Sequence, residues 1–196
     1  GFPALCWPAQ MYYGENMSKI EELLSSCCSL QNLKMEGIRI TSKVALGICL
    51  NGKTLQVLNL NHSLVDDIPF DRLNHFMPNG DFQSIIKCCQ ELKELDLNDT
   101  SVFYDNEVEG LSDNDFDVLV KNISPNVEKL NISNIYFEDE DIKNMLSRCN
   151  KIKVLTLEAK LITNDSLKMI RQCMNLTLEE LTLTYFAEFH LCLLEL

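Results

Sequence analysis

The clearest structural signal in the chain is the stretch Cys89-Gln90-Glu91-Leu92-Lys93-Glu94-Leu95-Asp96-Leu97. It has the order apolar-x-x-Leu-x-apolar, and a further apolar residue, Val102, follows five positions after Leu97. Leucines at alternate positions are typical of a short strand with one buried face, because the side chains of a strand alternate between its two faces. The stretch therefore predicts a short strand, followed by a turn that brings Val102 back beneath it toward a helix.

The same template recurs along the whole chain, which indicates a repeat architecture. Five copies are complete, and a sixth, which begins with Leu178, Leu181 and Leu183, has Glu188 in place of its fourth apolar residue. The apolar positions of the complete copies are Leu30, Leu33, Met35 and Ile40; Leu55, Leu58, Leu60 and Val65; Leu92, Leu95, Leu97 and Val102; Val127, Leu130, Ile132 and Phe137; Ile152, Leu155, Leu157 and Ile162.

The spacing of the central leucines identifies the kind of repeat. From Leu33 through Leu58, Leu95, Leu130 and Leu155 to Leu181 the steps are 25, 37, 35, 25 and 26 residues. Leucine-rich repeats are about 20 to 29 residues long, and the short steps fall in this range. The two long steps indicate insertions near Ile68–Gly80 and Asp99–Ser112.

Apolar residues at helical spacing fill the intervals between the predicted strands, and several of these segments open on Asp, Ser or Asn, which are good N-caps. The predicted helices are Ser18–Cys28, Ser42–Leu50, Asp81–Cys89, Asp113–Asn122, Asp139–Cys149 and Asn164–Cys173. Each unit can bury its apolar face only against its neighbours. We therefore predict an α/β leucine-rich-repeat solenoid of about six repeats, a curved horseshoe with short parallel strands on the concave side and helices on the convex side.

This repeat domain is predicted over residues 17–184. It follows an N-terminal non-repeat segment, residues 1–16, and precedes an apolar C-terminal tail, residues 185–196.

Four of the nine cysteines stand at a recurring position of the repeat. Cys27, Cys89 and Cys149 stand three positions before the first apolar residue of their copies, and Cys173 keeps this step if two residues are inserted before Leu178. Because a free cysteine is a small, usually buried side chain, we interpret them as core residues. The odd total of nine cysteines favours a reducing compartment, the cytoplasm or the nucleus. Seven Asn-x-Ser/Thr acceptors keep a secreted, glycosylated protein as an alternative.

The order Cys-x-x-Leu-x-x-Leu-x-Leu, seen from Cys89 to Leu97 and, with methionine at its end, from Cys27 to Met35, resembles the cysteine-containing leucine-rich repeats of F-box proteins. The resemblance covers roughly residues 17–184. It implies a role in substrate recognition by an SCF-type (cullin–RING) ubiquitin ligase, in which an F-box docks on the adaptor and the repeats hold the substrate. Residues 1–16 are too few for a three-helix F-box, so adaptor binding would require an F-box outside this chain. A general interaction scaffold or regulator is the alternative.

The residues between the inward-pointing leucines predict a binding surface. If the leucines face inward, the alternate positions face the concave surface. They are rich in Asn, Thr and carboxylates, which suit a peptide backbone or a basic segment of a partner protein, a substrate or a regulator. A merely solvated sheet face is the alternative. The predicted partner-binding residues are Lys34, Glu36, Asn59, Asn61, Asp96, Asn98, Asn131, Ser133, Thr156 and Glu158.

The segment from Asp99 to Asp117 carries seven carboxylates and no Lys or Arg, and it predicts an acidic loop containing Asp105, Glu107 and Glu109. Such a loop would dock a basic partner or would be a solvated insertion. Its first residues imitate the start of a calcium-binding EF-hand loop, but Phe116 stands where the terminal glutamate is required. We predict no metal here.

Composition and motifs exclude several functions. Seventeen basic and twenty-nine acidic residues give a net charge of -12, which repels nucleic acid and anionic membranes. No apolar stretch approaches the roughly 20 residues of a membrane-spanning helix. The three histidines share no motif with a serine or cysteine nucleophile, and no glycine-rich phosphate loop occurs. We therefore predict neither an enzyme nor a cofactor.

Overall fold

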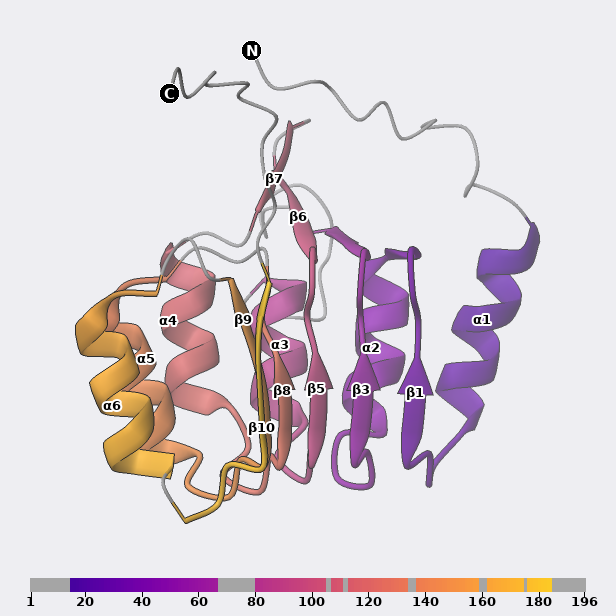
Figure 1. The fold of residues 1–196 in the computed structure, drawn as a ribbon. Coiled ribbons are helices and arrows are strands. Elements are labelled where there is room, and N and C mark those ends of the chain that lie inside the picture. Colours follow the sequence, from indigo (N-terminus) through magenta and orange to yellow (C-terminus); the bar gives the residue numbers. More distant parts are fainter. Residues whose placement is uncertain are drawn as a thin grey trace.

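In the computed structural model, residues 15–66, 80–104, 107–110, 113–133, 137–158, 162–174 and 176–184 are described. Helices alternate with short strands along the chain, so the predicted α/β class is confirmed (Figure 1). The helices are α1 (Glu15–Ser26), α2 (Ser42–Leu50), α3 (Asp81–Cys88), α4 (Asp113–Asn122), α5 (Asp139–Arg148) and α6 (Asn164–Met174). The strands of the main sheet are β1 (Asn32–Lys34), β3 (Val57–Asn59), β5 (Glu94–Asp96), β8 (Lys129–Asn131), β9 (Val154–Glu158) and β10 (Glu180–Thr184).

All six helices lie where the apolar spacing predicts them. The bounds of α2 and α4 match the prediction, and those of α3, α5 and α6 differ by one residue at the C-terminal end. The first helix, α1, begins three residues earlier than predicted, at Glu15, inside the segment expected to precede the repeats. At α2 the side-chain oxygen of Thr41 accepts a hydrogen bond from the N–H of Val44 at 3.3 Å, which makes Thr41 the N-cap. Among the described residues, no helix is both long enough and apolar enough to cross a membrane.

The main sheet has six strands in the order β1-β3-β5-β8-β9-β10, and all its pairings are parallel. Each strand therefore pairs with the strand of the next copy of the template. The register aligns the central leucines, Leu33 with Leu58, Leu58 with Leu95, and so on to Leu181. The template alone predicts this alignment, and each strand of the main sheet corresponds to one copy of the template.

The helices cover one face of the sheet, and the other face is open to the viewer in Figure 1. A continuous hydrophobic core fills the space between the helices and the sheet. It contains the central leucines of the middle strands, Leu58, Leu95, Leu130 and Leu155, all of which are buried. The leucines thus point toward the helices, which directs the alternate residues of each strand to the open face.

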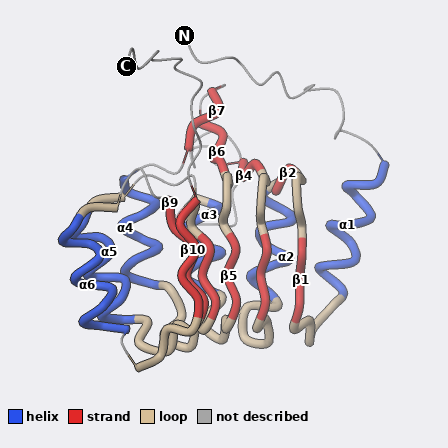
Figure 2. The backbone as a smooth tube through the Cα atoms, in the orientation of Figure 1, coloured by secondary structure: helices blue, strands red, loops and turns tan. Residues whose placement is uncertain are grey.

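A second sheet was not predicted. Its strands are β2 (Arg39–Ile40), β4 (Leu64–Asp66), β6 (Ser101–Tyr104) and β7 (Glu107–Gly110), in that order, and they lie at the carboxyl ends of the main strands (Figure 2). The first three pair in parallel and contain the apolar residue that closes each template, such as the buried Ile40 and Val65. The turn predicted after each main strand therefore runs into a second, very short strand.

The predicted acidic loop is a pair of strands for most of its described length. β6 and β7 are antiparallel, with Ser101 opposite Gly110 and Tyr104 opposite Glu107. The backbones of Glu107 and Glu109 thus lie in a strand, and Asp105 lies outside the described residues. Most of the predicted insertion at Ile68–Gly80 and the whole predicted tail, residues 185–196, also lie outside the described residues.

The cysteine prediction is right for two positions and wrong for one. Cys89 and Cys149 are buried and free, and burial raises the pKa of Cys89 to about 12 and that of Cys149 to about 11. Cys27 is half-buried, whereas Cys173 is exposed. Met174 is the buried residue at the end of α6, because the helix runs one residue further than predicted. One inserted residue before Leu178, and not the two expected, therefore brings Met174 rather than Cys173 into the core.

Polar side chains also tie neighbouring copies together behind the sheet. The buried Asn51 donates through Nδ2 to the carbonyl oxygens of Leu24 at 3.1 Å and Gly47 at 2.9 Å. Its Oδ1 accepts the N–H of Leu30 at 3.2 Å. One side chain thus provides hydrogen-bond partners for three backbone groups from two copies, two of them through buried bonds.

Candidate functional site

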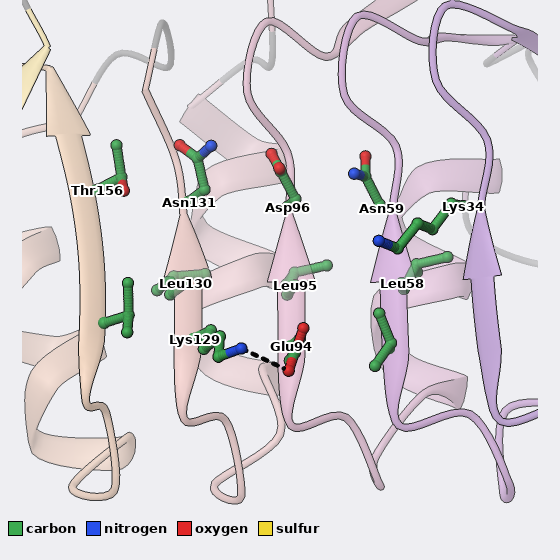
Figure 3. A pocket seen from close by; sticks show the side chains of 12 residues that line it. Lys34, Leu58, Asn59, Glu94, Leu95, Asp96, Lys129, Leu130, Asn131 and Thr156 are labelled. Carbon is green, nitrogen blue, oxygen red and sulfur yellow. Dashed lines mark ion pairs between the residues drawn. The ribbon is translucent and has the colours of Figure 1, made fainter. Parts of the chain in front are cut away.

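A shallow groove of about 200 Å³ crosses the open face of the main sheet (Figure 3). Successive strands contribute to it, from β1 at one side to β9 at the other. The groove is lined by Lys34, Val57, Leu58, Asn59, Glu94, Leu95, Asp96, Lys129, Leu130, Asn131, Val154 and Thr156. The groove therefore lies on the face that the alternation of the template predicts to be open.

Five of the predicted site residues form the central row of the groove: Lys34, Asn59, Asp96, Asn131 and Thr156. The strand register places them side by side, Lys34 next to Asn59, Asn59 next to Asp96, Asp96 next to Asn131 and Asn131 next to Thr156. The labelled side chains in Figure 3 follow this order. The structure brings these five residues together, and their use in binding stays a prediction.

The other five predicted residues form a second row, the strand-end row, which does not line the groove: Glu36, Asn61, Asn98, Ser133 and Glu158. Hydrogen bonds join three residues of this row, Asn61, Asn98 and Ser133, which come from successive copies. Asn98 Nδ2 donates to Asn61 Oδ1 at 2.8 Å, and the hydroxyl of Ser133 donates to Asn98 Oδ1 at 2.6 Å. These bonds link three neighbouring copies beside the groove.

For Ser133 and Glu158 the prediction of an exposed position is wrong. Ser133 is 2% exposed and Glu158 is 6% exposed. The main strand β8 ends at Asn131, so the alternation does not extend to Ser133, whose hydroxyl turns to Asn98 and Asn131. Glu158 is the last residue of β9 and pairs with Thr184 of β10. Alternation assigns each side chain to a face, but the neighbouring strand decides how much of it water can reach.

Three residues of this region adopt a backbone conformation that the template did not reveal. Gly37, His62 and Asp99 have φ values of 66, 55 and 53°. Each stands four positions after a central leucine, and the N–H groups of Gly37 and His62 donate to Asn61 O and Asn98 O at 2.9 Å. Glycine and aspartate at a fixed step are the signal that could have predicted a left-handed turn here.

His62 and Asp99 also meet directly, since His62 Nδ1 lies 2.8 Å from Asp99 Oδ2. Both side chains are about half exposed, at 46% and 47%. The contact joins the turns of two neighbouring copies at the edge of the open face. It is a surface contact, of a kind that contributes little to stability.

Besides three of the central leucines, four groove residues are absent from the predicted binding residues: Val57, Glu94, Lys129 and Val154, the first residues of β3, β5, β8 and β9. They form its strand-start row. Lys129 Nζ lies 3.0 Å from Glu94 Oε1, and the two valines flank this ion pair. The groove thus combines amide, hydroxyl and charged groups with two apolar side chains.

No protein-family model matches the chain, and no curated protein gives a significant match. Within the described ranges, no group of three or more His, Cys, Asp and Glu side chains could hold a metal ion. The chemistry that the groove offers is hydrogen bonding, charge and apolar contact.

Proposed function

We propose that the chain is a leucine-rich-repeat solenoid without catalytic activity that binds a segment of another protein in the groove. One observation carries the proposal: five adjacent strands place a polar side chain at the same register on the open face, and together these side chains line one groove. In this proposal the strands form the concave side of a curved horseshoe, and the helices form its convex side.

The aligned leucines support the solenoid. Each copy contributes one main strand and one helix, and its leucines are buried only where neighbouring copies contact it. This dependence on nearest neighbours is the defining property of repeat proteins. The steps of 25 and 26 residues agree with the length of leucine-rich repeats.

The shape and chemistry of the groove favour a protein segment as the ligand. At about 200 Å³ it is smaller than the roughly 300 to 1,000 Å³ of typical small-molecule pockets, and it is open along one sheet face. Amide and hydroxyl groups in a row can pair with the N–H and C=O groups of an extended chain. The net charge of -12 disfavours nucleic acid.

For the biological setting we propose substrate recognition in an SCF-type ubiquitin ligase, in the cytoplasm or nucleus. The support is the resemblance of the cysteine-containing repeats to those of F-box proteins. An interaction scaffold or regulator outside ubiquitin ligases is the second candidate, and a secreted recognition protein is the third. Co-purification of the full gene product with the adaptor separates the first from the second, and a mass without glycan excludes the third.

The binding proposal can be tested with a displayed library of random linear peptides. Peptides are selected on the wild-type chain and then measured on Thr156→Arg, which places a bulky charge in the groove. Asn144→Arg, on the exposed side of α5, is the control with the same added charge. We expect the peptides to lose binding to Thr156→Arg and to keep it for Asn144→Arg. Equal binding to both variants, or no selected peptide, would contradict the proposal.

A further inference from the structure

Four charged side chains line the groove: Lys34, Glu94, Asp96 and Lys129. Glu94 and Lys129 balance each other, because Lys129 Nζ lies 3.0 Å from Glu94 Oε1. Asp96 has no ion pair within the described part of the chain, and neither has Lys34. Lys34 comes from β1 at the side of the sheet, whereas Asp96 lies on β5 in its middle. The centre of the groove therefore holds a carboxylate without a counter-ion.

The neighbours of Asp96 fix its side chain but do not neutralise it. Its Oδ1 accepts the N–H of Asn98 at 3.0 Å, and its Oδ2 takes no hydrogen bond from the described residues. The adjacent residues in the row, Asn59 and Asn131, are neutral amides (Figure 3). Asn59 Nδ2 donates to Glu36 Oε1 at 2.9 Å, and no hydrogen bond joins Asn59 to Asp96 among the described residues. One oxygen of Asp96 thus remains available to a ligand.

Apolar surface lies at a position diagonal to Asp96 on the neighbouring strand. Val57 is in register with Glu94, one row below Asp96, and both valines of the strand-start row line the groove. Lysine and arginine side chains bury their methylene stems on apolar surface while their charged ends reach polar groups. Val57 and Asp96 present these two surfaces in neighbouring positions.

We propose that the protein segment bound in the groove carries a lysine or arginine whose charged end contacts Asp96, with its stem over Val57. This inference rests on the proposed function, since it assumes that the groove binds a protein segment. A charge-assisted hydrogen bond is roughly twice as strong as a neutral one, so a cation gains most at this position. The acidic chain as a whole also attracts a basic segment.

The test compares peptides selected on the wild-type chain with their binding to Asp96→Asn and Asp96→Lys. Glu22→Gln and Glu22→Lys, on the exposed surface of α1, are controls with the same net charges. We expect the selected peptides to share a lysine or arginine at one position and to bind Asp96→Asn about tenfold more weakly. A new selection on Asp96→Lys should replace that basic residue with Asp or Glu. Thermal melting of each variant checks that it is folded.

Three results would overturn the inference, and each has a different meaning. Peptides that lose binding to Thr156→Arg but share no basic residue, and that bind Asp96→Asn as well as wild type, refute the contact with Asp96 and leave the groove as the binding site. If no peptide depends on Thr156, the groove itself is refuted, and the inference falls with it. Equal weakening by Glu22→Lys and Asp96→Lys would show a general effect of net charge and would also refute the contact.

Discussion

The middle and the C-terminal end of the main sheet carry the same template but differ in burial. The central leucines Leu58, Leu95 and Leu130 are 0, 2 and 1% exposed, whereas Leu181 and Leu183 of β10 are 38 and 43% exposed. The middle strands have a neighbour on both sides, and β10 pairs with β9 alone among the described strands. The template therefore fixes the direction of a leucine, and the neighbouring copies determine its contribution to stability.

The largest expected effect is at the middle of the sheet. Leu95→Ala should lower the free energy of unfolding by about 2 to 5 kcal/mol, because it removes a fully buried side chain and leaves a cavity. Leu181→Ala should lower it by about 1 kcal/mol, since part of that side chain is already in water. Urea denaturation of both variants measures the difference. Equal losses of unfolding free energy in the two variants would refute the idea that neighbouring copies determine a leucine's contribution to stability.

A smaller effect is expected where a polar side chain joins two copies. Asn51→Ala removes the partners of Leu24 O, Gly47 O and the Leu30 N–H and should lower the free energy of unfolding by about 1 to 3 kcal/mol. Asn144→Ala, at an exposed position of α5, should change it by less than about 0.5 kcal/mol. Urea denaturation should show the larger loss for Asn51→Ala. An unchanged free energy of unfolding in Asn51→Ala would show that water replaces the side chain.

The ion pair in the groove should contribute little. Glu94 and Lys129 are 40% and 56% exposed, and exposed pairs contribute about 0.2 to 1 kcal/mol. A double-mutant cycle with Glu94→Gln and Lys129→Met measures the coupling energy. A value in this range, falling with added salt, is expected. A coupling energy well above it would mean that the groove is less exposed to water than described.

The smallest expected effect is a dependence of stability on pH at α5 and α6. Hydrogen bonds from Ser166 and Thr163 lower the pKa of Asp139. A carboxylate whose pKa is depressed by folding contributes stability above its unfolded pKa of about 3.9, and this contribution is lost as the pH falls through the folded pKa. Ser166→Ala should flatten the stability curve below about pH 4. Denaturation at a series of acidic pH values tests this, and an unchanged curve would contradict it.

Much of the fold could be predicted because the same pattern of apolar residues occurs several times along the chain. The positions of the leucines fixed the main strands and their neighbours, and the intervals fixed the helices. The second sheet escaped prediction because strands such as Arg39–Ile40 are too short to show a period. Cys173 was misplaced because an irregular step before Leu178 shifts the helix end to Met174.

The candidate site was predicted in part for the same reason. Lys34, Asn59, Asp96, Asn131 and Thr156 share one row because alternation holds within each strand. Ser133 and Glu158 lie at or beyond the ends of their strands, where contacts between copies decide burial. Those contacts join residues more than 20 positions apart, so the pattern within one repeat does not predict them.

Nuclear magnetic resonance mapping of a selected peptide on the labelled chain tests most directly whether the open face of the main sheet is the binding surface. We predict that the amide signals that shift on binding belong to β3, β5, β8 and β9, and that those of α3, α4 and α5 stay in place. Shifts confined to the helices would contradict the proposed function.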